Sequence, residues 1–498
     1  MGGIVPRTFV FMKIFPFYLL LAATAFAASP NVVLIITDQQ MADALSSRNG
    51  DRYLKTPAMD SLAAHGTFFT RAYAANPLCM PSRNSMFTGR YPHQTGVMDN
   101  THGRLDPEEF PCLGTFFQRA GYETVYYGKW HLNYDPKAPE IHGFETLDKQ
   151  MLDAVSADNA VKFLGRKHER PFFLVASFLN PHNTCELARG EPLSNGPIGS
   201  PPPLPELPPL PANAAPPRHE TDTMALMRKG YHASPLFPVG DFTALQWRDY
   251  RWGYNRLVEK ADGEIGRVLA ALRDAGLDGN TVIVFTSDHG ESDGAHGMNQ
   301  KTVFYEESAR VPLIVSYPGD DRARTNDRLV NTGIDLMPTL LDYAGIMRPA
   351  NLPGRSLRPL AVEETVADWP DEVVVENDMT QAGLVDGSVP MTQGRMVRTA
   401  RYKYCVYAYG NERESLIDLE KDPGEMDNLA RNPDYHSILL EMRERLRKFG
   451  ETESDKMVAI MLANDVGPRP FPQVDELKKS KKVKKHDKPK MAANQSGE

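Results

Sequence analysis

The sequence predicts an α/β fold: a large, mostly parallel β-sheet flanked by helices, followed by a smaller C-terminal α+β domain. Short β-branched apolar runs alternate along the chain with longer amphipathic segments. The runs are apolar at every position, which is typical of parallel strands buried on both faces. A chain of 498 residues also exceeds the size at which one hydrophobic core stops growing, so a second domain is expected.

The elements of the large sheet follow from these patterns. The apolar runs that we predict as strands are residues 31–37, 123–127, 172–177, 281–286 and 311–316. The clearest helical periodicities lie at residues 247–275 and 335–344. Residues 192–217 are rich in proline and cannot form a helix, so we expect a surface loop, with a proline-rich partner motif as the alternative.

After about residue 370 the pattern changes. We predict short strands at residues 373–376, 396–399 and 402–407, then one amphipathic helix at residues 435–449. Lysines crowd the last stretch, residues 478–490, without apolar partners, and this predicts a solvated, disordered tail that could bind acidic polymers.

The N-terminal segment has the features of an export signal. Lys13 precedes an apolar run at residues 14–23, and Ala25-Phe26-Ala27 has the form of a signal-peptidase site. The run is too short to span a bilayer, so a removed signal peptide is favoured over a retained anchor, and no later stretch is apolar enough to cross a membrane. The predicted organisation is a signal peptide at 1–27, a large domain at 28–370, an α+β subdomain at 371–470 and a basic tail at 471–498.

Net charge and glycosylation sequons indicate which partners and which cellular location to expect. The net charge of −8, with no nucleic-acid-binding signature, argues against nucleic acid as a partner. Asn494 begins the one good glycosylation sequon, whereas a heavily glycosylated lysosomal protein would carry more. We therefore expect an exported protein, periplasmic or secreted, with a bacterial source favoured.

Polar residues lie just past the carboxyl ends of four of the predicted strands. One such residue alone is more often a helix cap, a turn or a structural histidine. Ligands of open α/β sheets, however, bind at the carboxyl edge of the strands, and all these clusters fall on that edge. The residues are Asp38, Gln39, Lys129, His131, His182, Asp288 and His289.

The strongest local motif is Cys79-Met80-Pro81-Ser82-Arg83. Proline suits the first turn of a helix, where its missing N–H costs nothing. A helix that begins here places Cys79 and Arg83 four residues apart on one face. The motif alone is equally compatible with a buried cysteine beside a helix start.

Taken with further motifs in order along the chain, this sequence resembles the type I sulfatases of the alkaline-phosphatase superfamily. The motifs include Thr88-Gly89-Arg90, Gly128-Lys129-Trp130-His131, Ser287-Asp288-His289-Gly290-Glu291, Arg310-Val311-Pro312-Leu313, Asp335-Leu336-Met337-Pro338-Thr339, Gly354-Arg355-Ser356-Leu357 and Leu416-Ile417-Asp418-Leu419. The resemblance implies an alkaline-phosphatase-like fold and a sulfuric ester hydrolase, with residues 28–370 as the catalytic domain. Its expected substrate is a sulfated small molecule or saccharide, and export together with the lysine-rich tail favours polysaccharide fragments.

The resemblance also implies the roles of single residues. A formylglycine-generating enzyme would oxidise Cys79 to 3-oxoalanine (formylglycine) during export, and Arg83 would serve recognition of the motif and later hold the modified residue. One hydroxyl of the hydrated aldehyde attacks sulfur, and loss of the second hydroxyl's proton releases sulfate. His131 would take that proton and His182 would protonate the leaving alcohol. Lys129 and Lys301 would surround the sulfate oxygens.

By the same resemblance, one divalent cation is bound by Asp38, Gln39, Asp288 and His289 together with an oxygen of the modified Cys79. Many family members carry Asp at the position of Gln39 and Asn at that of His289. Calcium suits the oxygen ligands, whereas the histidine suits manganese or another transition metal equally well.

Two other functions remain open. The Asp-His pairing also resembles formylglycine-dependent phosphodiester and phosphonate monoester hydrolases on the same fold. A binder of sulfated glycans without turnover is a further alternative, although it would be expected to lack at least one catalytic group.

Two structural questions also remain open. If Cys79 is consumed, Cys112, Cys185 and Cys405 allow one disulfide at most, and the sequence does not say which. Loop residues that could shape a sugar subsite are His93, Asn100, His102 and those near Cys185.

Overall fold

The computed structural model describes residues 1–3, 29–101, 103–319, 322–378 and 382–474. Its centre is an eight-stranded sheet with the strand order β4-β3-β5-β1-β6-β7-β2-β8. Only β7 is antiparallel to its neighbours β6 and β2, and the other pairings of this sheet are parallel. The strands are β1 (Asn31–Asp38), β2 (Thr67–Tyr73), β3 (Glu123–Gly128), β4 (Thr146–Asp148), β5 (Phe172–Pro181), β6 (Thr281–Ser287), β7 (Leu313–Ser316) and β8 (Arg324–Asn331).

The five predicted strands of this sheet are confirmed as β1, β3, β5, β6 and β7, while β2, β4 and β8 were missed. Strand β1 is buried at all of its positions, which explains its uniformly apolar sequence. Strand β8 lies at the edge of the sheet and reads RTNDRLVN, which is too polar for the pattern to reveal. The predicted fold class, a mostly parallel sheet flanked by helices, is therefore confirmed.

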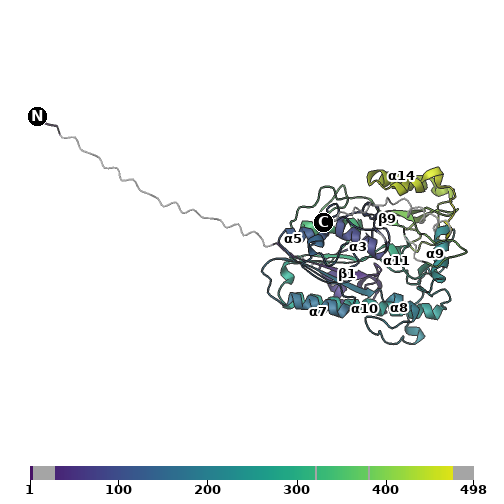
Figure 1. Cartoon of the computed structure of the whole chain (residues 1–498), viewed down its shortest axis with the longest axis horizontal. Helices are drawn as coiled ribbons and strands as arrows, with labels where there is room; N and C mark the ends of the chain where they lie inside the picture. Colours follow the sequence, from purple (N-terminus) through teal and green to yellow (C-terminus); the bar gives the residue numbers. More distant parts are fainter. Residues whose placement is uncertain (4–28, 102, 320–321, 379–381, 475–498) are drawn as a thin grey trace, which may run out of the picture.

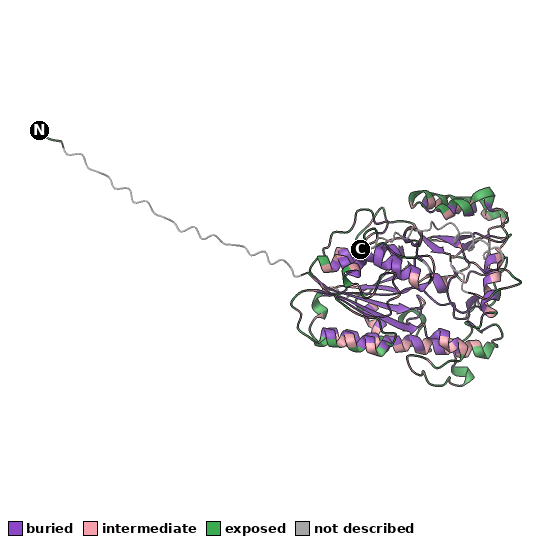
Figure 2. Cartoon of the chain, viewed as in Figure 1, coloured by how far each residue is buried: buried purple, intermediate pink, exposed green. Residues whose placement is uncertain are grey.

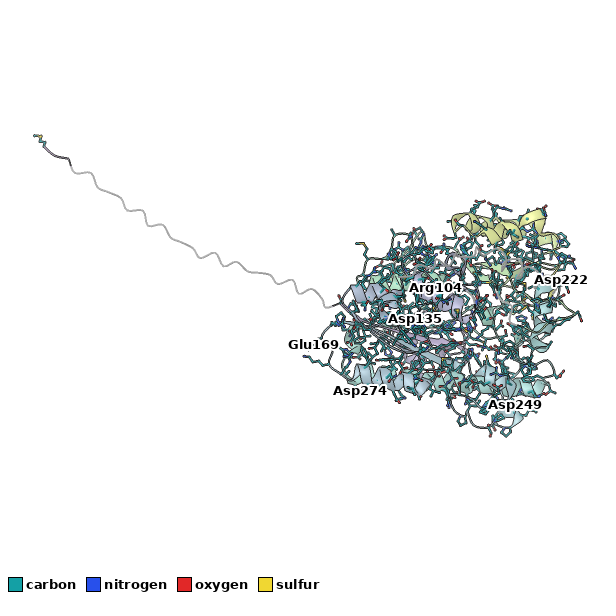
Figure 3. The ribbon with its side chains drawn as sticks, viewed as in Figure 1. Arg104, Asp135, Glu169, Asp222, Asp249 and Asp274 are labelled. Atoms are coloured by element: carbon teal, nitrogen blue, oxygen red, sulfur yellow. The ribbon has the colours of Figure 1, made fainter. Side chains whose placement is uncertain are left out.

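One face of the sheet is covered by α10 (Ala244–Asp274), α7 (Asp153–Leu164) and α2 (Pro57–Ala64). Helix α10 starts after a capping box between Thr243 and Gln246. Its apolar residues then recur every three or four positions and pack on the β1 side chains Val33 and Ile35. Figure 1 shows α7 and α10 below the sheet, and Figure 2 shows their buried sides facing it. In Figure 3, Asp274 marks the C-terminal end of α10, and Asp249 lies in its N-terminal part.

The opposite face is covered by α3 (Cys79–Thr88), α5 (Leu113–Arg119) and α12 (Thr332–Tyr343). Residues from these helices pack on Val32, Leu34 and Ile36, the β1 residues that alternate with those under α10. The predicted helix at 335–344 is thus confirmed, with its start three residues earlier. The result is a three-layer α/β/α arrangement in which α3 lies directly over the central strands (Figure 1).

The C-terminal part forms a second, antiparallel sheet with the strand order β12-β11-β10-β9. It consists of β9 (Glu372–Asn377), β10 (Gly394–Thr399), β11 (Tyr402–Tyr407) and β12 (Glu414–Asp418). Helix α14 (His436–Thr452) packs against it through an apolar face that includes Leu439, Met442 and Leu446. The three predicted strands and the helix are confirmed, and β12 is an additional strand.

The proline-rich stretch 192–217 is a surface segment whose regular structure is limited to the short 3₁₀ helix at Leu204–Glu206. Arg248 on α10 holds it by donating to the backbone carbonyls of Leu204, Leu207 and Pro208. The predicted signal peptide and lysine-rich tail lie almost wholly outside the described residues. Within the described part of the chain, no helix is long and apolar enough to cross a membrane.

Candidate active site

Four neighbouring parallel strands, β3, β5, β1 and β6, bring the polar clusters together at their carboxyl ends. Asp38 is the last residue of β1, and Asp288 directly follows β6. Lys129 and His182 directly follow β3 and β5. The sequence argument that all these clusters share one edge of the sheet is therefore confirmed.

The glycine before Lys129 has a steric reason. Gly128 adopts φ 108°, and a Cβ there would lie 1.8 Å from the carbonyl oxygen of Ser177. Without a side chain, the backbone approaches closely enough for the Lys129 amide to donate to that carbonyl at 2.9 Å. This contact sets the direction in which the chain leaves β3 toward the site.

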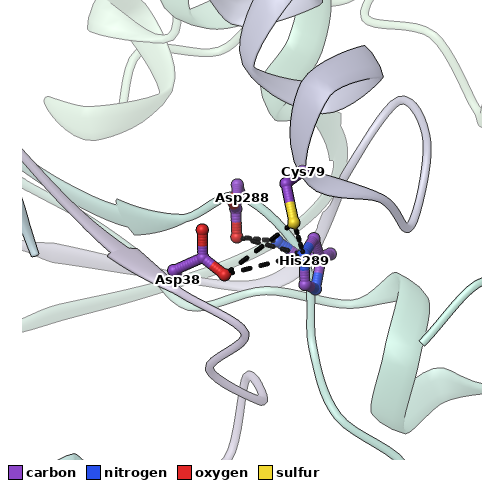
Figure 4. A group of neighbouring side chains, drawn as sticks. All are labelled: Asp38, Cys79, Asp288 and His289. Atoms are coloured by element: carbon purple, nitrogen blue, oxygen red, sulfur yellow. Dashed lines mark hydrogen bonds and ion pairs between the residues drawn. The ribbon is translucent and has the colours of Figure 1, made fainter. Parts of the chain in front are cut away.

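Cys79 is the first residue of α3, as its motif predicts, and it is buried. Its Sγ lies 3.2 Å from Nε2 of His289 and 3.3 Å from Nζ of Lys301. It also lies 3.9 Å from Oδ1 of Asp38 (Figure 4). Burial raises the pKa of the thiol, but the charges of Lys129 and Lys301, with His289, outweigh burial and hold the pKa well below its usual value. Cys79 is therefore favoured as a thiolate, within a positively charged surrounding.

Arg83 holds the two carboxylates in place. It is fully buried, with Nε 2.7 Å from Oδ2 of Asp288 and Nη2 3.0 Å from Oδ2 of Asp38. Nη1 donates to the Ser177 hydroxyl at 2.8 Å and to the Lys129 carbonyl at 3.0 Å. Because Arg83 takes the Oδ2 atom of each carboxylate, both Oδ1 atoms remain directed toward Cys79 and His289.

The two carboxylates differ in their electrostatics. Burial and the charge of Cys79 raise the pKa of Asp38, but Lys129, whose Nζ lies 2.5 Å away, with His182 and Arg83, holds it well below its usual value. Burial and the neighbouring Asp38 raise the pKa of Asp288 above its usual value, against the opposing effects of His289 and Arg83. Two adjacent buried acids of this kind repel each other, and a cation between them would relieve that repulsion.

The donor set fits a divalent cation. Ligating atoms of Asp38, Cys79, Asp288 and His289 all lie within 4.8 Å of one another and are buried. Nδ1 of His289 lies 3.0 Å from the carbonyl oxygen of Gly290, which fixes the proton on Nδ1 in the neutral ring and leaves the Nε2 lone pair facing the site. Carboxylate oxygens with one imidazole nitrogen suit both hard cations and manganese.

Gln39 adjoins this group of ligating atoms, and its backbone has a left-handed φ of 71°. Its backbone N–H donates to Oδ1 of Asp288 at 3.1 Å, and its side-chain Oε1 accepts from Nζ of Lys301 at 2.6 Å. Its Nε2 donates to Glu291. The motif that contains Glu291 was recognised in the sequence, but no role was predicted for this residue, nor for Ser177, which binds Arg83.

The two candidate proton carriers flank Cys79. Both His131 and His182 are half-buried, and each interacts electrostatically with the Cys79 thiol. Burial, Lys301 and Lys129 lower the pKa of His182 to about 4, so its ring is neutral in the free protein at pH 7. Nδ1 of His131 has no hydrogen-bond partner among the described residues.

The residues considered for a sugar subsite lie in different surroundings. Both ring nitrogens of His93 contact the C-terminal part of the chain, with Nδ1 2.5 Å from Glu376 and Nε2 2.9 Å from the carbonyl of Glu453. Asn100 accepts from the Met80 amide at 3.1 Å, beside the start of α3. His102 lies outside the described residues.

The cysteines form no disulfide in the described part of the chain. Cys79, Cys112, Cys185 and Cys405 are all free and buried. Cys185 is part of the site's surroundings, because its thiol lies 3.3 Å from the side-chain oxygen of Gln300, next to Lys301.

Comparison with known proteins identifies the family. The model of the sulfatase family matches residues 30–346, and that of the N-sulphoglucosamine sulphohydrolase C-terminal region matches residues 294–452. The Delta 4,5-hexuronate-2-O-sulfatase of Bacteroides thetaiotaomicron is 31% identical over 489 residues, covering 90% of this chain and 94% of its own. The ulvan-active sulfatase of Formosa agariphila is 30% identical, and the match covers 84% of this chain and 80% of that sulfatase. The chain belongs to the sulfatase family, whose members are enzymes that hydrolyse sulfate esters.

Solved structures agree with this assignment. A 2-O GAG sulfatase superposes with a TM-score of 0.74 at 30% identity, covering 86% of this chain and 93% of its own. The phosphonate monoester hydrolase of Agrobacterium radiobacter superposes with a TM-score of 0.66 at 25% identity. The superposition covers 85% of this chain and 96% of the hydrolase. The alkaline-phosphatase-like fold is thus confirmed, and it is shared by both of the reactions considered from the sequence.

Proposed function

We propose that this sulfatase removes sulfate from a sulfated saccharide, with formylglycine made from Cys79 as the nucleophile and one divalent cation in the site. The observation that carries the proposal is the position of Cys79 at the start of α3, 3.2 Å from His289, 3.3 Å from Lys301 and 3.9 Å from Asp38. The saccharide is proposed because relatives of 31% and 30% identity are named for a hexuronate and for ulvan.

Each residue has a proposed task. When bound, the cation supplies a positive charge that acidifies the nucleophile and polarises the sulfate. Formylglycine, as its diol, supplies the attacking hydroxyl and a second hydroxyl whose proton loss releases sulfate. Asp38, Gln39, Asp288 and His289 would hold the cation, while Lys129 and Lys301 would balance the charge that develops on the sulfate oxygens.

Protons are moved by the two histidines. His182 protonates the departing alcohol, and His131 accepts the proton of the second hydroxyl. Because the pKa of His182 is lowered to about 4 in the free protein, His182 must gain its proton together with the substrate, whose negative charge favours the imidazolium. We also propose that Arg83 presents the motif for modification by a formylglycine-generating enzyme, since the same four donor contacts fix the start of α3.

A formylglycine-dependent phosphodiester hydrolase or phosphonate monoester hydrolase is the second candidate. It is favoured by Gln39 and His289, which depart from the common sulfatase residues, and by the superposed hydrolase of 25% identity. The test compares sulfate release from sulfated saccharides of known linkage with hydrolysis of an aryl phosphodiester by one preparation. Cys79→Ala serves as the matched control for both. Faster turnover of the phosphodiester than of every saccharide and aryl sulfate would favour the second candidate.

Export is a further part of the proposal. It is supported by the apolar run at 14–23 followed by Ala25-Phe26-Ala27. Protein recovered from the periplasm or medium should begin at Ala28. Recovery only from the cytoplasm, with the first 27 residues intact, would contradict it.

A further inference from the structure

Glu291 is a buried carboxylate whose two oxygens have separate partners. Its side chain is 0% exposed, two residues after His289. Oε1 accepts from the Tyr250 hydroxyl at 2.9 Å, from the Gln300 backbone N–H at 2.7 Å and from the Asp293 backbone N–H at 3.3 Å. Oε2 lies 2.5 Å from Nε2 of Gln39. The Oε1 contacts therefore fix the carboxylate, and Gln39 is the one hydrogen-bond partner of Oε2 among the residues that the structure describes.

The amide of Gln39 lies between two partners of opposite kind. The Glu291 carboxylate only accepts hydrogen bonds, so the NH₂ group of Gln39 must face it. On the other side, the ammonium of Lys301 only donates, and it contacts the Gln39 side-chain oxygen at 2.6 Å. Both neighbours select the same orientation, with the oxygen of Gln39 turned toward Lys301, whose Nζ also lies 3.3 Å from Sγ of Cys79.

We propose that Glu291 is a positioning residue that locks the Gln39 amide with its oxygen toward the catalytic centre and thereby makes Gln39 an oxygen ligand for the cation. This inference rests on the proposed metal-dependent function. Glu291 acts only through Gln39. A residue that orients a ligand from behind typically changes metal affinity by about 10–100-fold when it is replaced.

The variant Glu291→Gln gives the sharpest test because it keeps the shape and removes one acceptor. Three donors, the Tyr250 hydroxyl and the backbone N–H groups of Gln300 and Asp293, would hold the oxygen of the new amide, so its NH₂ would point at Gln39. Gln39 would then have to rotate its amide and present NH₂ to the centre. Cation binding should weaken about 10-fold or more, although no ligand has been deleted.

The measurement is the Kd of Ca²⁺ and of Mn²⁺ for the metal-free protein, obtained by competition with a fluorescent chelator. A double-mutant cycle separates positioning from general damage. Glu291→Gln should weaken binding about 10-fold or more in the parent, but less than about 2-fold in a Gln39→Ala background. Asp262→Asn is the matched control, because Asp262 is a buried acid of α10 that accepts hydrogen bonds from the Ala58 and Met59 amides. The Kd of this variant for both cations should equal that of the parent.

Equal losses in both backgrounds, or an unchanged Kd in Glu291→Gln, would overturn the inference while leaving the metal-dependent function intact. A parent that binds neither cation would overturn the proposed function itself. If Glu291→Gln does not fold, as judged by the melting temperature of the metal-free protein, Tyr250→Phe replaces it in the cycle. That variant removes one of the donors to Oε1 and should weaken binding severalfold only where Gln39 is present.

Discussion

Replacing Arg83 by methionine tests how the two carboxylates are held. Arg83, Asp38 and Asp288 are all 0% exposed, and the guanidinium makes ion-pair contacts of 3.0 and 2.7 Å to the two acids. Methionine keeps much of the volume but leaves both acids without this partner. Removing one member of a buried ion pair costs about 3–5 kcal/mol, so the metal-free variant should lose at least that much free energy of unfolding at pH 8.

The stability loss of Arg83→Met should depend on pH and on the cation, each in a definite direction. Without Arg83 the pKa values of both carboxyls rise in the folded protein, which then binds protons above pH 4 that the unfolded chain does not. Stability therefore falls as the pH rises, and the loss should be larger at pH 8 than at pH 5. A saturating divalent cation should recover part of the loss, because it neutralises the same acids.

The assay is urea unfolding followed by tryptophan fluorescence, with and without cation. Arg413→Met is the matched control, since Arg413 is also buried but donates to the backbone carbonyls of Tyr407, Met461 and Gly467 in the C-terminal part rather than to acids. Its loss should not depend on the cation. A loss below about 1 kcal/mol for Arg83→Met at pH 8, or an equal cation effect in both variants, would refute the reasoning.

The remaining predictions concern the histidines and one buried acid. His182→Ala should slow a sugar sulfate by about 10²–10⁴-fold but nitrophenyl sulfate far less, because nitrophenolate leaves without a proton; equal losses in kcat would contradict the role. His131→Ala should slow breakdown of the sulfated intermediate for every substrate, visible as added sulfate by intact mass, and absence of trapped sulfate would argue against it. Burial raises the pKa of Asp293 to about 7, so its folded form retains a proton from about pH 4 to 7 and stability falls as the pH rises through that window. Asp293→Asn, which tolerates the φ of 48°, should be more stable than the parent by up to about 4 kcal/mol at pH 8 and equal near pH 4 in urea unfolding; parallel pH profiles would refute this.

Part of this structure could be predicted from local sequence. Strands such as β1 and β6 are buried on both faces and have no polar positions in their centres, so their apolar runs identify them. The start of α3 follows from the proline in its first turn. Strand β4 has only three residues and β8 is polar at the sheet edge, so neither carries a pattern that distinguishes it from a loop.

The residues of the candidate site also fall into those that local sequence predicts and those that it does not. Residues that directly follow strands could be placed at one edge, because parallel strands align their carboxyl ends. The contact between Glu291 and Gln39 joins residues 252 positions apart, and no local pattern gives the direction of an amide. The sequence left open whether His93 is a subsite or a structural residue, because its bond to Glu376 depends on how the second sheet packs. Tertiary packing, rather than local propensity, decides these cases.

The central claim is that Cys79 becomes the nucleophile, and peptide mass spectrometry of an active preparation tests it most directly. After co-expression with a formylglycine-generating enzyme, the peptide containing Cys79 should be lighter by about 18 Da than the thiol form, the mass difference between thiol and aldehyde. Across preparations, the rate of sulfate release should rise in proportion to the fraction of converted peptide. Full activity in protein whose Cys79 remains entirely a thiol would contradict the account.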